Sequence, residues 1–346
     1  MKQAGKLFLI LSVLQSLILT SCVSKNERFA KTADDYLIKS GFSGSVMVVK
    51  KGKIIFSGGY GSSDVKNPEA LPNDLNTVYE TGSLSKQLVA AAILKLVEKR
   101  KLNLDDNIYQ FFPDFKHGKK ITIRMLLNMR SGLTDHINCA HDFFPKSIHS
   151  VIAGNQLSNK HVDYNFVQVY LPSAPIIAEP DATYFYCNTN YYLLAKIIEQ
   201  ISGKTYEDFM TKKILSRCGM ENSNFDFQNT SAKGYVGGRY YSIPAGLAFG
   251  CGDLNSSVMD LYKWNCAFLG GKIVSKKYIR ELKHANGYHY GWNCGNKMIF
   301  HAGNTNVFNS YNSYNFKTKT QIIVLCNTPV GKCNATKIAG VLNKFL

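Results

Sequence analysis

The chain has 346 residues, of which 45% are hydrophobic and 19% are charged, and its formal net charge is +17. This composition excludes a disordered chain, and the length allows one large domain or two ordinary ones with a sizeable core. No nucleic-acid-binding module is recognisable, so nucleic acid is not expected as a partner. A basic surface suits anionic lipids or acidic wall polymers, but we favour a solvated lysine-rich surface without a partner.

The first residues have the pattern of a secretory signal. Lys2 and Lys6 precede an apolar run at 7–20 that is too short to cross a bilayer comfortably as a mature helix. The run ends in Leu19-Thr20-Ser21-Cys22, which resembles the lipobox of bacterial lipoproteins.

Three expectations follow for this segment. Residues 1–21 are a lipoprotein signal peptide, Cys22 carries the lipid that anchors an exported protein in a membrane of the cell envelope, and residues 22–30 are a polar tether. The alternative is an ordinary cleaved signal with a chance cysteine beside small residues.

The middle of the chain contains one predicted hairpin and two predicted helices. Two β-branched runs at 46–49 and 54–56 flank a turn at 50–53 and predict the hairpin. A helix begins at Ser83, because apolar residues between 89 and 97 recur at helical spacing. After a mixed helical region, a second helix has an apolar face at 194–201 and ends at Gly203.

The last third of the chain returns to strands, at 298–301, 310–316 and 321–326, followed by an amphipathic helix at 336–346. Strands at both ends of the chain with helices between them predict an α+β fold, in which both ends complete one sheet around an inserted helical region. The sequence contains neither an internal repeat nor a low-complexity linker, so we expect one composite unit.

Cysteine spacing gives no sign of a metal site. The cysteines after Cys22 contain no C-x-x-C pair and no His/Cys zinc pattern, and we expect no cofactor. Pairing in an oxidising compartment and buried free thiols are both open for the remaining eight: Cys139, Cys187, Cys218, Cys251, Cys266, Cys294, Cys326 and Cys333.

A Ser-x-x-Lys motif occurs twice, as Ser63/Lys66 and as Ser83/Lys86. Serine is a poor nucleophile until a base accepts its proton, and a lysine three residues later on a helix lies on the same face. Only the second motif opens an apolar helix, which places its serine at a positive helix N-terminus. The alternative role of Ser83 is a helix cap.

Two further motifs carry groups that suit such a site. Of 20 tyrosines, only Tyr186 is followed two residues later by an asparagine, Asn188, and this pair suits a proton relay and a carbonyl-binding amide. A buried tyrosine and a turn asparagine are the alternative. His301-Ala302-Gly303 ends a predicted strand, where glycine lets backbone approach a ligand and the next N–H can point at an oxyanion.

In this order, the three motifs resemble the serine β-lactamase and penicillin-binding superfamily, specifically its class C β-lactamase-related branch of serine hydrolases. The similarity covers about 31–346. Beyond the motifs it includes the segments 81–86, 121–127, 131–133, 184–189, 252–254 and 260–264.

The resemblance implies a β-lactamase/transpeptidase-like catalytic domain over 31–346. Its antiparallel sheet, flanked by helices, would lie at about 40–82 and 245–346, and its helical part at about 83–244. Ser83 would be acylated, with Lys86 as its base partner and a cleft between the two parts.

The resemblance also assigns roles to five further residues. Tyr186 would relay protons and Asn188 would bind substrate. The N–H groups of Ser83 and Asn304 would form an oxyanion hole beside Gly303, where Asn304 replaces a common glycine. His301 stands where β-lactamases of this branch carry lysine, and we expect it to hold an anionic substrate group less well as it deprotonates between about pH 6 and 7.5.

The sequence therefore predicts an acyl-enzyme serine hydrolase that acts on a small-molecule or peptide substrate. Cell-wall-type peptides of D-amino acids and small esters come ahead of β-lactams. The alternative is a penicillin-binding or sensor module of the cell envelope that does not turn over.

Overall fold

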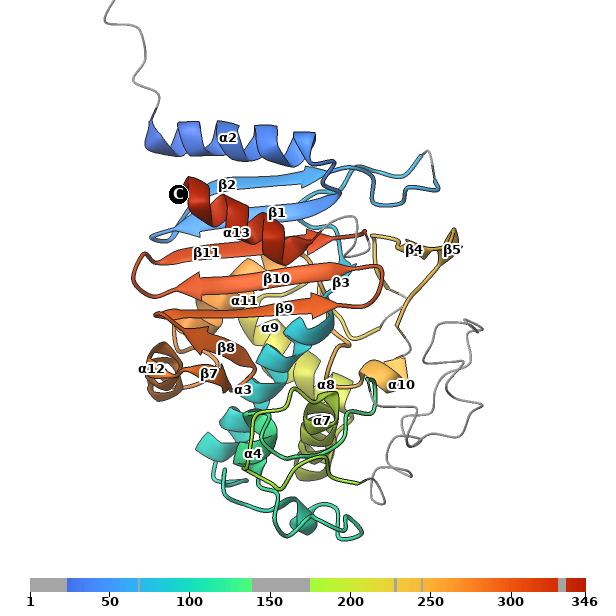
Figure 1. The fold of residues 1–346 in the computed structure, drawn as a ribbon, viewed down its shortest axis with the longest axis vertical. Helices are drawn as coiled ribbons and strands as arrows, with labels where there is room; N and C mark the ends of the chain where they lie inside the picture. Colours follow the sequence, from blue (N-terminus) through green and yellow to red (C-terminus); the bar gives the residue numbers. More distant parts are fainter. Residues whose placement is uncertain (1–23, 68, 139–174, 227–228, 244, 329–333) are drawn as a thin grey trace, which may run out of the picture.

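The computed structural model describes residues 24–67, 69–138, 175–226, 229–243, 245–328 and 334–346 (Figure 1). The predicted signal peptide, Cys22, Cys139 and Cys333 lie outside these residues. Within them, no helix is both long and apolar enough to span a membrane.

One antiparallel sheet forms the upper part of the molecule, with its strands in the order β2-β1-β11-β10-β9-β8-β7 (Figure 1). The strands are β1 (Gly44–Lys50), β2 (Lys53–Tyr60), β7 (Gly287–His289), β8 (Trp292–Gly295), β9 (Met298–Asn304), β10 (Asn309–Asn315) and β11 (Thr320–Cys326). Strand β1 pairs with β11 from Gly44↔Cys326 to Lys50↔Thr320. Both ends of the chain therefore complete one sheet, which confirms the predicted fold class.

Helices α2 (Lys25–Lys39) and α13 (Ala335–Phe345) cover the outer face of this sheet (Figure 1). Their apolar faces enclose a core with Val46 and Val324. The expectation of a polar tether at 22–30 is wrong for the described part, because helix α2 begins at Lys25. Ser24 and Glu27 form a capping box there, which stabilises a helix even though the sequence is polar.

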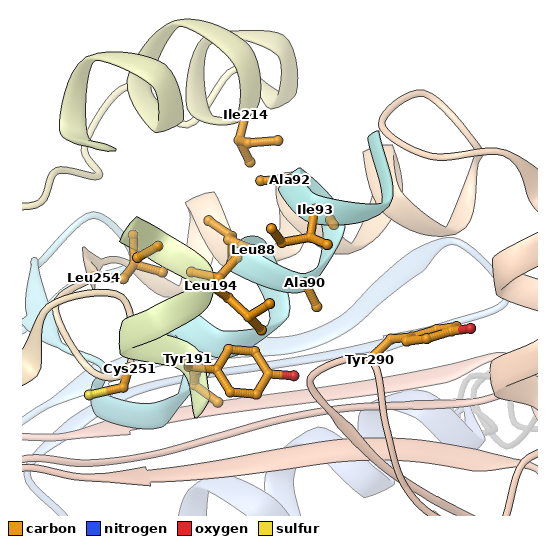
Figure 2. Close-up of a cluster of buried hydrophobic side chains, with 14 of the residues drawn as sticks. Leu88, Ala90, Ala92, Ile93, Tyr191, Leu194, Ile214, Cys251, Leu254 and Tyr290 are labelled. Atoms are coloured by element: carbon orange, nitrogen blue, oxygen red, sulfur yellow. The ribbon is translucent and has the colours of Figure 1, made fainter. Parts of the chain in front are cut away.

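The larger core lies between the inner face of the sheet and the helical part. Helix α3 (Ser85–Glu98) runs through its middle, and its residues from Ser85 to Leu94 are all buried. Figure 2 shows α3 between α7, which presents Tyr191 and Leu194, and the helical segment that carries Ile214. Because α3 is packed on all sides, the residues at its N-terminus are held in fixed positions.

Helix α7 (Asn188–Ser202) ends at Gly203, whose φ of 64° is left-handed, as the sequence predicts. The remaining described elements are β3 (Tyr79–Glu80), η1 (Gly82–Leu84), η2 (Ile108–Gln110), α4 (Ile123–Leu127), α8 (Tyr206–Met210), η5 (Thr211–Leu215), α9 (Ser216–Cys218), β4 (Tyr235–Val236), β5 (Arg239–Tyr240), α10 (Ala245–Ala248), β6 (Asn255–Ser256), α11 (Val258–Leu269) and α12 (Lys276–His284). The pair β3-β6 leads directly into the site described next.

Candidate active site

Ser83 lies in the 3-10 turn η1, between β3 and α3. Gly82 makes this sharp change of direction possible with a φ of 54°, and a side chain at that position would come within 2.9 Å of Asn304 N. Ser85 Oγ donates to Gly82 O at 2.9 Å and accepts from Leu254 N at 2.8 Å. These bonds hold the turn rigidly, so the Ser83 side chain has a defined position.

Two predicted partners reach the Ser83 hydroxyl. Lys86 Nζ lies 2.9 Å from Ser83 Oγ, and the Tyr186 hydroxyl donates to the same oxygen at 2.8 Å. Lys86 Nζ also lies 5.0 Å from the centre of the Tyr186 ring. The structure therefore brings the serine, the amine and the phenol together, as the motifs predict.

Lys86 is fully buried, and its side-chain nitrogen contacts three oxygen atoms. Besides Ser83, it donates to Asn188 Oδ1 at 2.8 Å and to Cys251 O at 2.6 Å. A neutral amine has two N–H groups and one lone pair. The two fixed acceptors can take both N–H groups, which aims the lone pair at the Ser83 hydroxyl, as a general base requires.

Asn188 thus contacts the base, and the carboxylate behind it is a residue that sequence reasoning missed. Asp135 is fully buried, and its Oδ2 accepts from Asn188 Nδ2 at 2.9 Å and from Asn188 N at 3.2 Å. Its Oδ1 accepts from the backbone of Ile137 and Asn138, which line the active-site cavity. The sequence signal that could have found it is an acidic residue two positions after Ser131-Gly132-Leu133.

Strand β9 supplies the second half of the predicted oxyanion hole. Thr305 N donates to Phe308 O across the β9–β10 turn, and N–H groups of successive residues in a strand point to opposite edges. The N–H of Asn304 therefore points away from β10, toward Gly82 and Ser83. A Cβ on Gly303 would collide with Thr81 O and lie 3.0 Å from Ser83 N, so only glycine allows this approach.

His301 does not occupy the position we expected. Its ring is 2% exposed and is not among the residues that line the cavity. Nδ1 lies 2.6 Å from Ala302 O, which can only accept, so Nε2 accepts from the Tyr288 hydroxyl at 3.1 Å. Burial, followed by the charge of Lys86, lowers the pKa of His301 to about 3. The predicted loss of carboxylate affinity between pH 6 and 7.5 is therefore wrong, because this imidazole is already neutral there.

The active-site cavity has a volume of about 450 Å³ and opens over Ser83. Its described walls are mostly backbone, amides and hydroxyls, contributed by Gly82, Ser83, Ile137, Asn138, Tyr186, Asn188, Ile243, Cys251, Gly252, Ala302, Gly303, Asn304, Thr305, Asn309, Ser310, Asn334 and Thr336. None of these wall residues is a lysine, arginine, histidine or acid. The described residues also contain no cluster of ligands that could hold a metal ion.

Two buried acids lie beside the site. Burial raises the pKa of Glu80 to about 7, although hydrogen bonds from Ser242 and Thr305 oppose the shift. Burial likewise raises the pKa of Asp253 to about 7, against the hydrogen bond from Gly250 N. Glu80 accepts from Ser242 and Asp253 from Gly250 N, and neither acid is among the described residues that line the cavity.

Cysteine chemistry is not part of this site. Cys187, Cys218, Cys251, Cys266 and Cys294 are thiols without a disulfide bond, and all but Cys266 are buried. Burial raises the pKa of Cys251 to about 12, which keeps it protonated and unreactive at neutral pH. Of the two readings that the sequence left open, these five cysteines follow the free-thiol one.

The Ser83 hydroxyl is thus in contact with an amine and a phenol, beside the N–H groups of η1 and of the end of β9. This arrangement defines a serine hydrolase of the β-lactamase and penicillin-binding type. The chain belongs to the beta-lactamase family, which it matches over residues 29–342.

Several proteins are similar to the chain over most of its length. PbpX of Bacillus subtilis (strain 168), named provisionally as a penicillin-binding protein, is 28% identical over 340 residues, covering 93% of this chain and 80% of PbpX. Protein flp of Staphylococcus aureus (strain MRSA252) is 28% identical over 310 residues, and the match spans 82% of this chain and 59% of flp.

Solved structures show the same architecture. The octameric penicillin-binding protein homologue from Pyrococcus abyssi is 27% identical with a TM-score of 0.73, over 90% of this chain and 75% of that one. A D-amino acid amidase from Ochrobactrum anthropi SV3, complexed with L-phenylalanine, is 20% identical with a TM-score of 0.75, over 93% of this chain and 97% of that one. The second likeness concerns the fold alone.

Proposed function

We propose that this protein hydrolyses amide bonds of D-amino-acid peptides and amides through an acyl-enzyme on Ser83. The observation that carries the proposal is the double contact of Ser83 Oγ with Lys86 Nζ and the Tyr186 hydroxyl, at the floor of a cavity. The preference for D-amino-acid substrates rests on the similarity to penicillin-binding proteins.

The geometry supports a two-step reaction. Lys86 accepts the Ser83 proton while Oγ forms a bond to the substrate carbonyl carbon, and the N–H groups of Ser83 and Asn304 stabilise the oxyanion. Tyr186 donates a proton to the leaving amine as the C–N bond breaks, and is reprotonated through Lys86. Water then attacks the ester and passes a proton through the Tyr186 hydroxyl to Lys86; as the bond between Ser83 Oγ and the acyl carbon breaks, Lys86 returns that proton to Oγ and the acid product leaves.

The walls of the cavity favour substrates whose leaving group has no free carboxylate. The described wall residues carry no cationic side chain, and His301 is neutral and buried. A terminal carboxylate would lose its water shell there without a charged partner, which is unfavourable. The amide and hydroxyl side chains of the walls can instead form hydrogen bonds with a carboxamide or an ester. We therefore place amides and esters of D-amino acids ahead of D-Ala-D-Ala acids and β-lactams.

Two measurements test this proposal. The first follows the mass of the intact protein, residues 23–346, with a fluorophosphonate, and compares it with Ser83→Ala; one probe mass should be added only to the wild type. The second compares hydrolysis of N-acetyl-D-alanine amide, its L isomer, N-acetyl-D-Ala-D-Ala, a p-nitrophenyl ester and nitrocefin. Fluorophosphonate labelling that survives Ser83→Ala contradicts the mechanism. Faster turnover of the free-acid peptide or of nitrocefin than of the D-alanine amide contradicts the substrate class. After incubation with a penicillin, an adduct mass that persists on the intact protein favours the sensor alternative.

We also propose that the protein is exported and anchored through a lipid on Cys22. The lipobox-like sequence Leu19-Thr20-Ser21-Cys22 supports this, and the first described helix begins at Lys25. Metabolic labelling with an alkyne fatty acid should mark the wild type and not Cys22→Ala. Equal labelling of the two, or none of either, contradicts the anchor.

A further inference from the structure

A second cavity lies toward the other end of helix α3 from Ser83. Its volume is about 230 Å³, and five of the residues that line it are lysines: Lys95, Lys99, Lys101, Lys204 and Lys213. At a helical rise of 1.5 Å per residue, Lys95 lies about 18 Å from Ser83 along the helix axis. The two cavities share no lining residue, so this lysine cavity is separate from the active site.

The positive charge around the lysine cavity is not neutralised by the protein. None of the ion pairs found within the described residues includes any of the five lysines. Burial, followed by the charges of Arg217 and Lys99, lowers the pKa of Lys95 below its ordinary value. The charge of Glu98 opposes this shift, but one negative charge does not offset five lysines. The cavity therefore has a positive potential that favours an anion.

Helix ends explain only part of this cluster. Lys95 and Lys99 lie in the last turn and at the C-cap of α3, where cations stabilise the carbonyl end of a helix. Lys95 Nζ also donates to Ile273 O at 3.0 Å. Lys101 and Lys204 lie beyond the ends of α3 and α7, and Lys213 lies inside a helical segment.

The position of Lys213 depends on a π-helical turn. The segment η5 is a π-helix, and the buried pairs Phe209/Met210 and Ile214/Leu215 are five residues apart. An uninterrupted α-helix would turn position 213 into the core, whereas the extra residue leaves the lysine half-buried at the cavity. π-turns are rare and often mark functional sites, so this one is an independent sign of a ligand.

From this cluster we propose that the lysine cavity binds phosphodiester groups of an anionic polymer. Five ammonium groups exceed the charge of a single phosphate, which favours a ligand with several negative charges. Lysine binds phosphate as a point charge without the paired geometry that arginine imposes, which suits a flexible polymer. Figure 1 shows α7 and α8 at the opposite end of the molecule from the N-terminus of α2. Helix α2 and the helices that line the lysine cavity therefore lie on opposite sides of the sheet.

The test uses fluorescently end-labelled inorganic polyphosphate and fluorescence anisotropy at low and at physiological salt. The variant Lys99→Gln/Lys101→Gln/Lys204→Gln changes three exposed residues of the cavity. The control Lys276→Gln/Lys277→Gln/Lys283→Gln removes the same charge from the exposed face of α12. Fluorophosphonate labelling of Ser83 should be the same in all three proteins, because neither change touches the active site, and thermal unfolding checks that each variant is folded.

We expect the cavity variant to bind polyphosphate at least tenfold more weakly than the wild type, and the control to stay within twofold of it. An equal loss of polyphosphate affinity in both variants would show an effect of net charge alone and would overturn the proposed site. Wild-type binding too weak to measure at low salt would overturn it as well. Two parallel arms identify the ligand. Orthophosphate competing as well as polyphosphate, at equal phosphate concentration, contradicts a polymer. The second arm measures binding to phosphatidylglycerol vesicles. If the cavity variant loses binding to these vesicles but not to polyphosphate, a polymer ligand is contradicted and a membrane surface is favoured.

Discussion

Replacing Asp135 with asparagine keeps the shape of the side chain and removes its charge. The five N–H contacts of the Asp135 carboxylate all require an acceptor, and asparagine has a single oxygen. One of the two sets of partners, either Asn188 or the backbone at 137–138, must then face an NH₂ group. The charge-assisted bond that keeps Asn188 Oδ1 toward Lys86 is lost or weakened in either case.

The size of the effect follows from these contacts. A hydrogen bond to a charged group contributes about 1.5–3 kcal/mol, and each 1.4 kcal/mol changes a rate about tenfold. If the Lys86–Asn188 contact at 2.8 Å is lost, we expect acylation of Ser83 to slow roughly 10- to 100-fold. We expect a loss of stability of about 1–3 kcal/mol as well, because buried donors are left unpaired.

A double-mutant cycle separates the catalytic effect from the structural one. The acylation rate is measured by intact mass with a fluorophosphonate for wild type, Asp135→Asn, Asn188→Ala and the double variant, each at several pH values. If Asp135 acts by positioning Asn188, its replacement changes the rate little once Asn188 is gone, while the loss of Tm persists. The same fold-reduction in both backgrounds would refute this reasoning, as would a normal rate in Asp135→Asn.

Three further predictions concern single residues. Gly303→Ala should slow acylation at least about 100-fold, because its Cβ would displace the N–H of Ser83, and unchanged labelling would contradict the oxyanion hole. His301→Gln should leave the dependence of KM on pH between about pH 5 and 8 the same as in the wild type, because burial lowers the pKa of His301 to about 3; an inflection near pH 6.5 that is present in the wild type and absent from His301→Gln would contradict its burial. Glu80 binds its proton more tightly in the folded protein, so wild-type stability should fall as the pH rises from about 4.5 to about 7. The free energy of unfolding should therefore fall less between pH 5 and pH 8 in Glu80→Gln than in the wild type, by at most about 3 kcal/mol, as thermal unfolding at the two pH values would show.

Elements with strong local patterns could be predicted from the sequence. The hairpin at 50–53, the helix after Ser83 and the Gly203 stop are confirmed, because residue spacing and turn chemistry determine them within a few residues. Helix α2 (Lys25–Lys39) was not predicted at all, because most of its residues are polar. A capping box and a narrow apolar stripe stabilise that helix, and the stripe is buried only once α2 packs on the sheet.

The site could be predicted only as far as its motifs extend. Ser83 and Lys86 are three residues apart on one helix, so their contact is a local property that spacing reveals. Tyr186 is about a hundred residues away, and only the resemblance to a family linked it to Ser83. The same motif match suggested a substrate-facing role for His301. That role was wrong because His301, although it lies on the same face of β9 as Gly303, packs against the rings of Tyr186 and Tyr288 and is buried.

The state of the base depends on contacts that no motif contains. Lys86 accepts a proton usefully only if its neighbours fix its hydrogens, and those neighbours are a backbone carbonyl at Cys251 and an amide oriented by Asp135. A carbonyl has no sequence signature, and the Asp135–Asn188 contact spans 53 residues. Serine hydrolases that share the Ser-x-x-Lys motif can thus differ in reactivity through the residues that surround the lysine. The segment after Ser131-Gly132-Leu133 is where we expect that difference to be encoded in this protein.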